Sequence, residues 1–513
     1  MSQIYIAYGS ETGNAEYLAH HFQQSLSAHG FTSQLSTLNQ LPLSSLQAQD
    51  YLFIFCSNFG DGEAPGNATE FYQELLCLKK LDTQFIVFGL GDVSYPKFCG
   101  FTQALDEQLR KLGATAIGHR VDADTNYKIF FNEWQNAVLA YLNNEKESLQ
   151  NLILQVKAYD ENSGFEALIH KVTRINQGEF PIYDIDIDIT GSDMCYSAGD
   201  LLYLIPPANQ HSLQRINHFY GGLSQEERLQ LEKKELRLLT KSLFRSIAKK
   251  TKNKDIKALI KISATKEFNQ YIYGRDIADV LSDFCTTENM PINELLEILS
   301  DKLPRAYSIA SCGQVSPNIV KLCVREVNYQ LNNQQYYGSA SHFLCQAKAG
   351  DKIKVYIRSN PHFQLPEDQN APLIMIGAGT GIAPYLGFLQ QKRNAETHLF
   401  FGERYRNKDF IYQEHFAELQ NKGHLTQLHT AFSRDQAEKI YVQNIVEQQS
   451  EIIWRLLQNN GHIYICGSKN NLSHPLDEAL QKIMMKYTHA DEEQAQQWLY
   501  NLVTEKRLHK DLY

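Results

Sequence analysis

Residues 4–15, IYIAYGSETGNA, join a short apolar strand to the first turn of a helix through a loop of glycine and hydroxyl residues. The loop sets the hydroxyls of Ser10 and Thr12 beside the amides of a helix N-terminus. Such a turn binds phosphate without needing lysine or a metal. This stretch predicts a doubly wound α/β fold with an anion site at the carboxyl end of its first strand.

Four more short apolar segments follow at 33–37, 51–56, 85–89 and 116–121, and helical segments separate them. Five strands that alternate with helices predict a parallel sheet over residues 1–142. The next residues are polar, and we expect a linker over 143–155.

The remainder of the chain predicts two further folds. Residues 183–189 alternate apolar and polar side chains, as a half-buried antiparallel strand does. Strand patterns return at 305–309, 319–327 and 352–357, and helical spacing fills the gap. We therefore expect an antiparallel β-barrel over 156–207 and 296–366, a helical insertion over 208–295, and a second parallel α/β domain over 367–513. The fold class is multidomain α/β.

Composition limits the functions that the chain can have. At 513 residues with 43% hydrophobic and 21% charged residues, it is an ordinary globular chain. Its apolar runs are strand-sized and no leader precedes the first strand, so we expect a cytoplasmic protein. None of its nine cysteines forms a C-x-x-C pair, so we expect no metal and an organic redox cofactor.

Charge is spread unevenly along the chain. Residues 1–145 hold 15 acidic against 7 basic residues, whereas the other 368 hold 43 against 42. Nucleic acid is an unfavourable partner for such a surface. The acidic first domain is either a solubility surface or the docking face for a basic protein.

Three loops of the first domain form the first candidate site. Each follows a parallel strand at its carboxyl end, where ligands of open sheets bind, and Phe59 and Tyr95 could stack on a flat ring. The candidates are Ser10, Glu11, Thr12, Gly13, Asn14 and Ala15, then Ser57, Asn58, Phe59, Gly60, Asp61 and Gly62, then Leu90, Gly91, Asp92, Tyr95, Phe98 and Cys99.

The barrel carries a second candidate site. Arg305, Ala306, Tyr307 and Ser308 place a planar cation, a ring and a hydroxyl on one strand, and an arginine fork suits a pyrophosphate. Gly338, Ser339, Ala340 and Ser341 add a second set of phosphate donors before a helix.

A third site opens the C-terminal domain. A buried strand turns through residues 377–381, GAGTG, into a helix, which is a pyrophosphate turn that offers Gly379, Thr380 and Gly381. Glu403 could accept from a ribose 2′-hydroxyl and would favour NAD. Against it stand the cations, hydroxyl, phenol and amide of Ser433, Arg434, Lys439, Tyr441 and Gln443, which favour NADPH.

Together these motifs resemble the NADPH-dependent diflavin reductases over essentially the whole chain. The first domain resembles flavodoxin, which implies FMN, and the barrel motifs imply FAD, with Cys323 and Val324 beside it. The resemblance also implies that Ser308, Cys466, Asp511 and the terminal Tyr513 surround the reacting nicotinamide and flavin. This family usually has an acid where this chain has Ser468, so no acidic role is carried over there.

Residues 120–127, RVDADTNY, together with Cys99 and Tyr513, are similar to the flavoprotein subunits of assimilatory sulfite reductases. That resemblance implies electron flow from NADPH to FAD, to FMN, and then to the haemoprotein subunit of sulfite reductase. A reductase serving a haem monooxygenase or another haem protein stays open, as does an inactive flavodoxin-like carrier, against which the intact Arg305, Ser308 and Arg434 argue.

Overall fold

The computed structural model describes residues 2–58, 62–93, 97–124, 127–150, 152–156, 159–161 and 163–513. Contacts divide the chain into two compact units, residues 1–160 and 161–513. No helix of the described ranges is long and apolar enough to cross a membrane.

The first unit is a doubly wound parallel sheet, as the sequence predicts. Its strands run in the order β2-β1-β3-β4-β5, and β6 also pairs directly with β4. Their bounds are β1 (Ile4–Gly9), β2 (Ser33–Thr37), β3 (Tyr51–Ser57), β4 (Gln84–Leu90), β5 (Thr115–Ala116) and β6 (Val121–Ala123). The strand expected at 116–121 is wrong as a single element, because β5 and β6 are separate short pieces that pair with opposite ends of β4.

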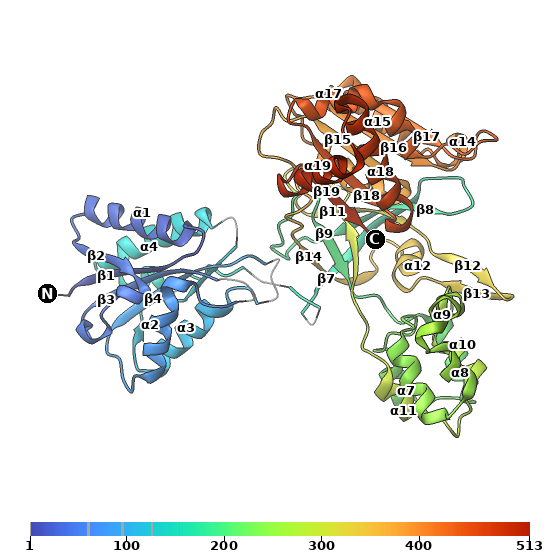
Figure 1. Ribbon diagram of the computed structural model, residues 1–513. Helices are drawn as coiled ribbons and strands as arrows, with labels where there is room; N and C mark the ends of the chain where they lie inside the picture. Colours follow the sequence, from blue (N-terminus) through green and yellow to red (C-terminus); the bar gives the residue numbers. More distant parts are fainter. Residues whose placement is uncertain are drawn as a thin grey trace. The chain divides into compact units, whose positions relative to one another are not determined.

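Helices cover both faces of this sheet (Figure 1). They are α1 (Asn14–Ala28), α2 (Gly66–Cys77), α3 (Gly100–Lys111) and α4 (Lys128–Leu142), with short turns η1 (Leu38–Gln40), η2 (Leu43–Ser45) and η3 (Lys146–Leu149). The hydrophobic cluster on one face includes Phe22 of α1 and Trp134 of α4, and that on the other includes Phe71 of α2 and Leu105 of α3. Both clusters lie wholly within the first unit.

The polar segment 143–155, which we expected to be a linker, is packed on the first unit over much of its length. Leu149 and Leu154 are buried in the cluster that contains Trp134. The Ser148 hydroxyl donates to the Ala137 carbonyl at 2.8 Å, and the Asp122 amide donates to the Leu154 carbonyl at 3.0 Å.

The second unit begins with a six-stranded antiparallel sheet in the order β10-β9-β14-β7-β8-β11. A bridge between Ile309 and Leu322 joins its two end strands and closes the predicted barrel. The strands are β7 (Phe165–Arg174), β8 (Ile182–Asp188), β9 (Leu201–Leu204), β10 (Arg305–Ser308), β11 (Ile319–Arg325) and β14 (Lys352–Arg358). A hairpin of β12 (Asn328–Leu331) and β13 (Gln334–Tyr337) precedes helix α12 (Ser339–Gln346).

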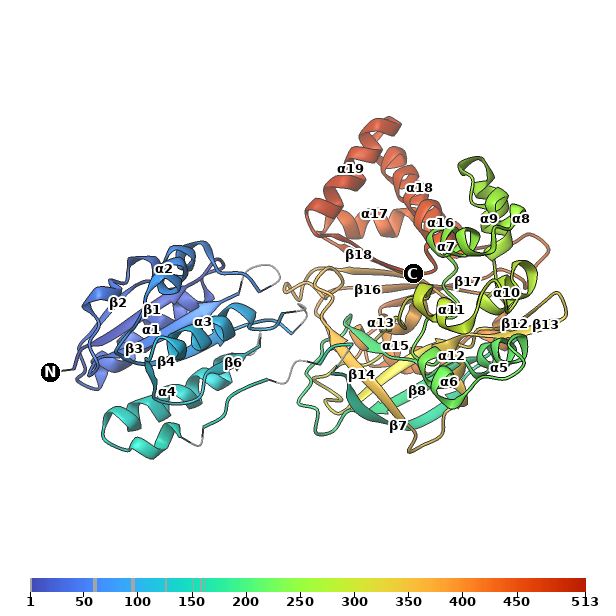
Figure 2. The same cartoon turned by 90° about the horizontal axis from the view of Figure 1, so that it is seen from below.

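Between β9 and β10 the chain forms the expected helical insertion, which has its own hydrophobic cluster. Figure 2 shows the hairpin β12–β13 beside these helices. They are α5 (Gln210–Phe219), α6 (Gln225–Leu231), α7 (Lys241–Thr251), α8 (Lys254–Leu259), η4 (Ile262–Ala264), α9 (Thr265–Ile272), α10 (Ile277–Phe284) and α11 (Ile292–Ile298).

The C-terminal part is a second parallel sheet in the order β17-β16-β15-β18-β19. Its strands are β15 (Leu373–Ala378), β16 (Thr397–Glu403), β17 (Gln427–Phe432), β18 (His462–Gly467) and β19 (Leu508–Leu512). Its helices are η5 (Gly379–Ile382), α13 (Ala383–Phe388), α14 (Arg406–Asp409), α15 (Gln413–Asn421), α16 (Val442–Gln448), α17 (Ser450–Gln458), α18 (Lys469–Thr488) and α19 (Glu492–Thr504). One hydrophobic cluster includes both Cys323 of the barrel and Met375 of this sheet, so the two pack as one unit.

The packing of Leu149 and Leu154 predicts where the first unit can be cut. A chain that ends after residue 160 should unfold in urea as one cooperative transition. A chain that ends after residue 142 loses both buried leucines, and we expect its free energy of unfolding to fall by about 3 kcal/mol or more. Equal urea midpoints for the two chains would contradict this boundary.

Candidate functional site

The first proposed phosphate site lies at the carboxyl end of β1. Gly13 precedes α1 with φ of 85°, a left-handed conformation that glycine adopts without strain. The Ser10 hydroxyl accepts the Gly13 amide at 3.0 Å, and the Ser10 amide donates to Asn67 at 2.9 Å. Helix α1 has no side-chain cap from the described residues, which leaves its first amides available to an anion.

The neighbouring candidates divide into those that can reach a ligand and those that are occupied. The Thr12 side chain is exposed, whereas the Glu11 carboxylate accepts the amide of Gly66 and Asn14 accepts the Tyr127 hydroxyl at 3.2 Å. Ala15 is buried in the core and could offer only its amide.

The other two loops of this edge are partly described. Phe59, Gly60, Asp61 and Tyr95 lie outside the described residues. The Asn58 side chain accepts the amide of Phe101 at 3.2 Å, and the amide of Gly91 donates to Ala123 at 2.8 Å. Ser57, Gly62 and Asp92 are half-buried, and the side chains of Leu90, Phe98 and Cys99 are buried. The side chains of Leu90, Phe98 and Cys99 therefore pack under the loop and could not contact a ligand themselves.

The second proposed site is built by β10 and the start of α12. Arg305 donates to the buried Glu235 carboxylate at 2.7 Å and to the Leu303 carbonyl at 2.7 Å. The Ala306 side chain is exposed, and burial raises the pKa of the half-buried Tyr307.

The segment that carries the second set of donors is held to the end of β11. The amide of Gly338 donates to Val327 at 2.8 Å, and the Ser341 hydroxyl accepts the Val327 amide at 3.1 Å. Ser339 is half-buried, whereas Ala340 belongs to the barrel cluster. Cys323 and Val324 are buried in two different hydrophobic clusters, so towards a ligand they could offer only main-chain atoms.

The four residues expected around the reaction centre are brought together in the second unit. The Ser308 hydroxyl donates to Asp511 at 2.5 Å, and the Cys466 thiol lies 3.7 Å from the same carboxylate oxygen. Asp511 stands opposite Cys466 in the parallel pairing of β18 with β19. Burial, and then the nearby Asp511 charge, raise the pKa of Cys466, which keeps the thiol protonated at neutral pH.

Tyr513 lies at the same edge of the C-terminal sheet. Its amide donates to Gly467 at 3.1 Å and its carbonyl accepts the Lys469 amide at 2.9 Å. Its hydroxyl is 3.0 Å from the Thr380 hydroxyl, although the residue stays 64% exposed. The terminal residue is thus anchored through its backbone and presents an accessible ring.

The glycine turn after β15 passes close under the end of β18. A side chain at Gly381 would collide with the Cys466 carbonyl, so only glycine allows this approach. Gly379 has φ of 59°, and the following helix α13 starts without a side-chain cap from the described part of the chain.

The residues proposed for the nucleotide 2′-phosphate lie where β16 and β17 end. The amide of Ser433 donates to Glu403 at 2.9 Å, and that of Arg434 donates to Arg404 at 2.8 Å. Ser433 is buried and Arg434 is half-buried. Lys439 and Tyr441 are exposed and Gln443 is half-buried at the start of α16.

Two further cations lie near the proposed 2′-phosphate site and were not identified from the sequence. Arg404 and Arg406 follow the last residue of β16, and the Arg406 guanidinium lies 4.5 Å from the centre of the Phe432 ring. The signal that could have found them is the cationic Arg-x-Arg directly after a strand of a parallel sheet.

Glu403, the alternative acceptor for a ribose 2′-hydroxyl, already has partners within the protein. The buried Glu403 carboxylate forms an ion pair with Arg325 and accepts the Arg404 amide at 2.7 Å. Burial is the largest influence on its pKa and raises it. Glu403 is therefore a structural carboxylate, which removes the residue on which the NAD interpretation depended.

Comparisons with known proteins agree with this geometry. Residues 6–134 match the flavodoxin family, and residues 375–473 match the oxidoreductase NAD-binding domain family. The sulfite reductase [NADPH] flavoprotein alpha-component of Shewanella sp. (strain MR-7) is 31% identical, over 99% of this chain and 89% of that protein. Its counterpart in Photobacterium profundum is 32% identical, over 100% of this chain and 89% of that protein. The chain belongs to this family of flavoproteins.

Members of this family are NADPH-dependent flavin oxidoreductases, and the donor groups of this chain fit FMN, FAD and NADPH. The helices α1, α12 and α13 that begin at the three proposed phosphate sites all lack a side-chain cap within the described chain. In the insertion, α5, α6, α7, α8 and α10 are capped by Asn209, Ser224, Thr240, Asn253 and Asp276, whereas α9 and α11 are not capped by any described side chain. Uncapped amides suit anionic phosphates.

The contacts of Asp511 predict its role. Asp511→Asn weakens the acceptor that holds Ser308, and we expect NADPH-dependent flavin reduction to slow by about 10- to 100-fold, with parent flavin content. Asp477→Asn is the control, because that carboxylate pairs with Lys510, the preceding residue of β19, at 2.6 Å. Stopped-flow absorbance measures both rates. Equal rates for the two variants would remove Asp511 from the reaction site.

The cationic cluster predicts nucleotide selectivity. Arg434→Ala removes charge-assisted hydrogen bonds to a 2′-phosphate, so the KM for NADPH should rise about tenfold or more. The KM for NADH should hardly change. Arg455→Ala, which removes a cation paired with Glu396 elsewhere on the domain, serves as the control. Equal losses for both nucleotides would place the phosphate contact elsewhere.

Proposed function

We propose that this chain carries electrons from NADPH through FAD and FMN to a haem protein, the haemoprotein subunit of sulfite reductase, in the cytoplasm. The observation that carries the proposal is the meeting of Ser308 and Cys466 at the Asp511 carboxylate, beside the ring of Tyr513. These side chains come from the barrel and from the C-terminal sheet, which are the two folds expected to hold FAD and NADPH.

The residues named above would hold the cofactors, which supply hydride and single-electron chemistry when bound. In the barrel, Arg305 and residues 338–341 would bind the pyrophosphate of FAD. In the C-terminal sheet, residues 379–381 and the cluster at Ser433 and Arg434 would bind NADPH. In the first unit, the uncapped start of α1 would bind the phosphate of FMN.

The side chains at the junction orient and protect the reacting groups. Asp511 fixes the Ser308 hydroxyl with its proton directed at the carboxylate. The raised pKa of Cys466 keeps its thiol neutral, so no thiolate forms to attack the flavin. The ring of Tyr513 is 64% exposed, and its hydroxyl is 3.0 Å from that of Thr380, so the ring can cover or uncover the site by a side-chain movement.

The acidic first unit is proposed to dock the acceptor. Glu11, Glu16 and Glu63 are exposed near the carboxyl ends of β1 and β3, where the FMN loops lie. Exposed charges of this kind act mainly on the association rate and are screened by salt.

We therefore expect salt to slow one step of the relay. Raising ionic strength from about 0.01 M to about 0.15 M shortens the Debye length from about 30 Å to about 8 Å. Reduction of the haemoprotein subunit from the same cell should slow several-fold, while flavin reduction by NADPH should hardly change.

A matched pair of variants locates the docking face. Glu63→Gln should weaken the salt dependence of acceptor reduction, whereas Glu145→Gln, which follows helix α4, should leave it at the parent value. Salt-independent reduction of the haemoprotein would remove the electrostatic claim. Failure to support sulfite reduction would favour a different haem protein as the acceptor.

A further inference from the structure

A short segment of the helical insertion, residues 235–237, contacts both halves of the proposed pyrophosphate site. It lies between α6 and α7 and runs beside the residues that lead into β10. The amide of Glu235 donates to Ser300 at 2.9 Å, and the amide of Lys302 donates to Lys233 at 2.9 Å. The segment is therefore fixed relative to the strand that carries Arg305.

Glu235 holds one half of the site. Its side chain is 4% exposed, and its carboxylate accepts Arg305 at 2.7 Å and the amide of Arg237 at 3.2 Å. Arg305 also donates to the Leu303 carbonyl at 2.7 Å. A guanidinium has five N–H donors, so these two contacts orient Arg305 and leave donors for a ligand.

Arg237 holds the other half. One of its terminal nitrogens donates to the Tyr337 carbonyl, which directly precedes Gly338, and the other donates to the Tyr329 hydroxyl at 2.6 Å. The side-chain amide of Asn209 donates to the same Tyr337 carbonyl at 2.8 Å. The start of α12 is thus tied to the insertion by two side chains.

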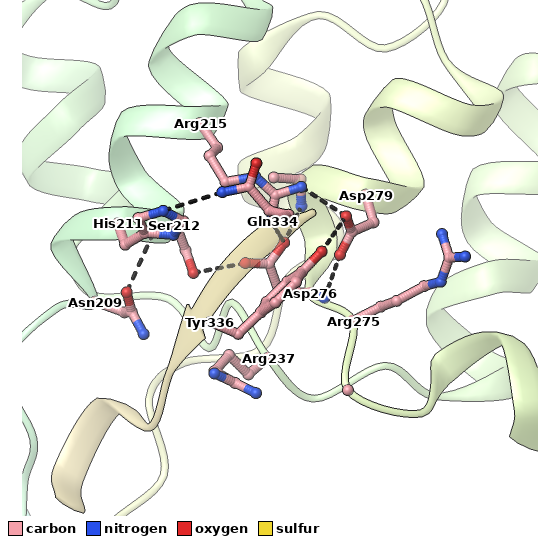
Figure 3. Close-up of polar contacts among 12 residues, drawn as sticks. Asn209, His211, Ser212, Arg215, Arg237, Arg275, Asp276, Asp279, Gln334 and Tyr336 are labelled. Atoms are coloured by element: carbon pink, nitrogen blue, oxygen red, sulfur yellow. Dashed lines mark hydrogen bonds and ion pairs between the residues drawn. The ribbon is translucent and has the colours of Figure 1, made fainter. Parts of the chain in front are cut away.

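A buried ion network secures the hairpin that leads to this point (Figure 3). Arg215 of α5 pairs with Asp276 at 3.0 Å and with Asp279 at 2.6 Å, and the Tyr336 hydroxyl donates to Asp279 at 2.7 Å. Breaking one of these ion pairs would leave a buried charge unpaired, which is strongly destabilising. The network therefore holds the hairpin in one position relative to α5 and α10. The hairpin therefore cannot easily absorb a shift at residue 337.

We propose that Glu235 and Arg237 are positioning residues that set the distance between Arg305 and residues 338–341, and thereby the affinity of the barrel for a pyrophosphate-bearing dinucleotide. The proposal rests on the proposed function, in which that dinucleotide is FAD. Positioning and simple electrostatics predict opposite signs. The Glu235 carboxylate repels a pyrophosphate, so on charge alone its removal would tighten binding, whereas loss of positioning loosens it.

The test is the FAD dissociation constant of the full chain, measured from the fluorescence of flavin released on dilution. Glu235→Ala should raise it about tenfold, which corresponds to about 1.4 kcal/mol. Glu235→Gln keeps an acceptor for Arg305 and should raise it less. The urea unfolding of the second unit, which should match that of the parent, reports that each variant is folded. An unchanged or lower FAD dissociation constant for Glu235→Ala would overturn the proposal.

A double variant shows whether Glu235 acts through Arg305. Glu235→Ala should add nothing to the loss caused by Arg305→Ala, because residues that act through one contact are not additive. Arg237→Gln, which acts through Tyr337, should add to it. Additive losses for Glu235→Ala and Arg305→Ala would overturn the positioning role.

Two further results separate this inference from the site itself. Lys234→Ala is the control, since its ion pair with the exposed Asp301 lies outside the site, and it should keep the parent dissociation constant. If Arg305→Ala binds FAD as the parent does, the proposed FAD site and the inference both fail. If Arg305→Ala loses FAD and Glu235→Ala does not, only the inference fails.

Discussion

The parallel pairing of the last strand, β19, with β18 is the constraint on which the proposed reaction site depends. Its register sets Asp511 opposite Cys466 and Leu512 opposite Gly467. That placement lets one carboxylate meet the Ser308 hydroxyl of the barrel and the Cys466 thiol of the sheet. Strand pairing holds the end of the chain, so the position of Tyr513 follows from backbone geometry.

Much of the fold follows from local patterns in the sequence. The apolar strand and glycine turn of residues 4–15 predict the first sheet because strand, turn and helix N-terminus are all short-range features. The barrel and its helical insertion follow from a change in hydrophobic period, which is also local.

Other features depend on contacts that no local pattern contains. Ser308 and Asp511 are 203 residues apart in sequence, and their hydrogen bond forms only after two folds have packed. Glu235 has no motif around it, and its ion pair with Arg305 joins residues 70 apart in the sequence. The polar composition of 143–155 suggested a linker, but Leu149 and Leu154 are buried because burial is decided by the neighbouring helix and sheet. The resemblance named Ser308 and Asp511, and the structure supplies the geometry that joins them.

All three regions proposed to bind anions contain a helix N-terminus without a side-chain cap, although other helices, such as α2 and α11, also lack one within the described chain. Capping by Asn, Ser, Thr or Asp stabilises a helix by about 1 kcal/mol, and several helices of the insertion use it. Helices α1, α12 and α13 have no side-chain cap within the described chain and so lack this stabilisation. A phosphate that accepts these amides would compensate for the missing caps. The ion pair with Glu235 orients Arg305 toward the place where we propose that the pyrophosphate binds.

The proposed relay runs between two different flavins that two different folds hold. The most direct test is to purify the chain, release its flavins with acid and separate them by chromatography. We expect equal amounts of FMN and FAD, one of each per chain, and retention of FMN alone by residues 1–160. A single type of flavin, or FAD retained by the first unit, would contradict it.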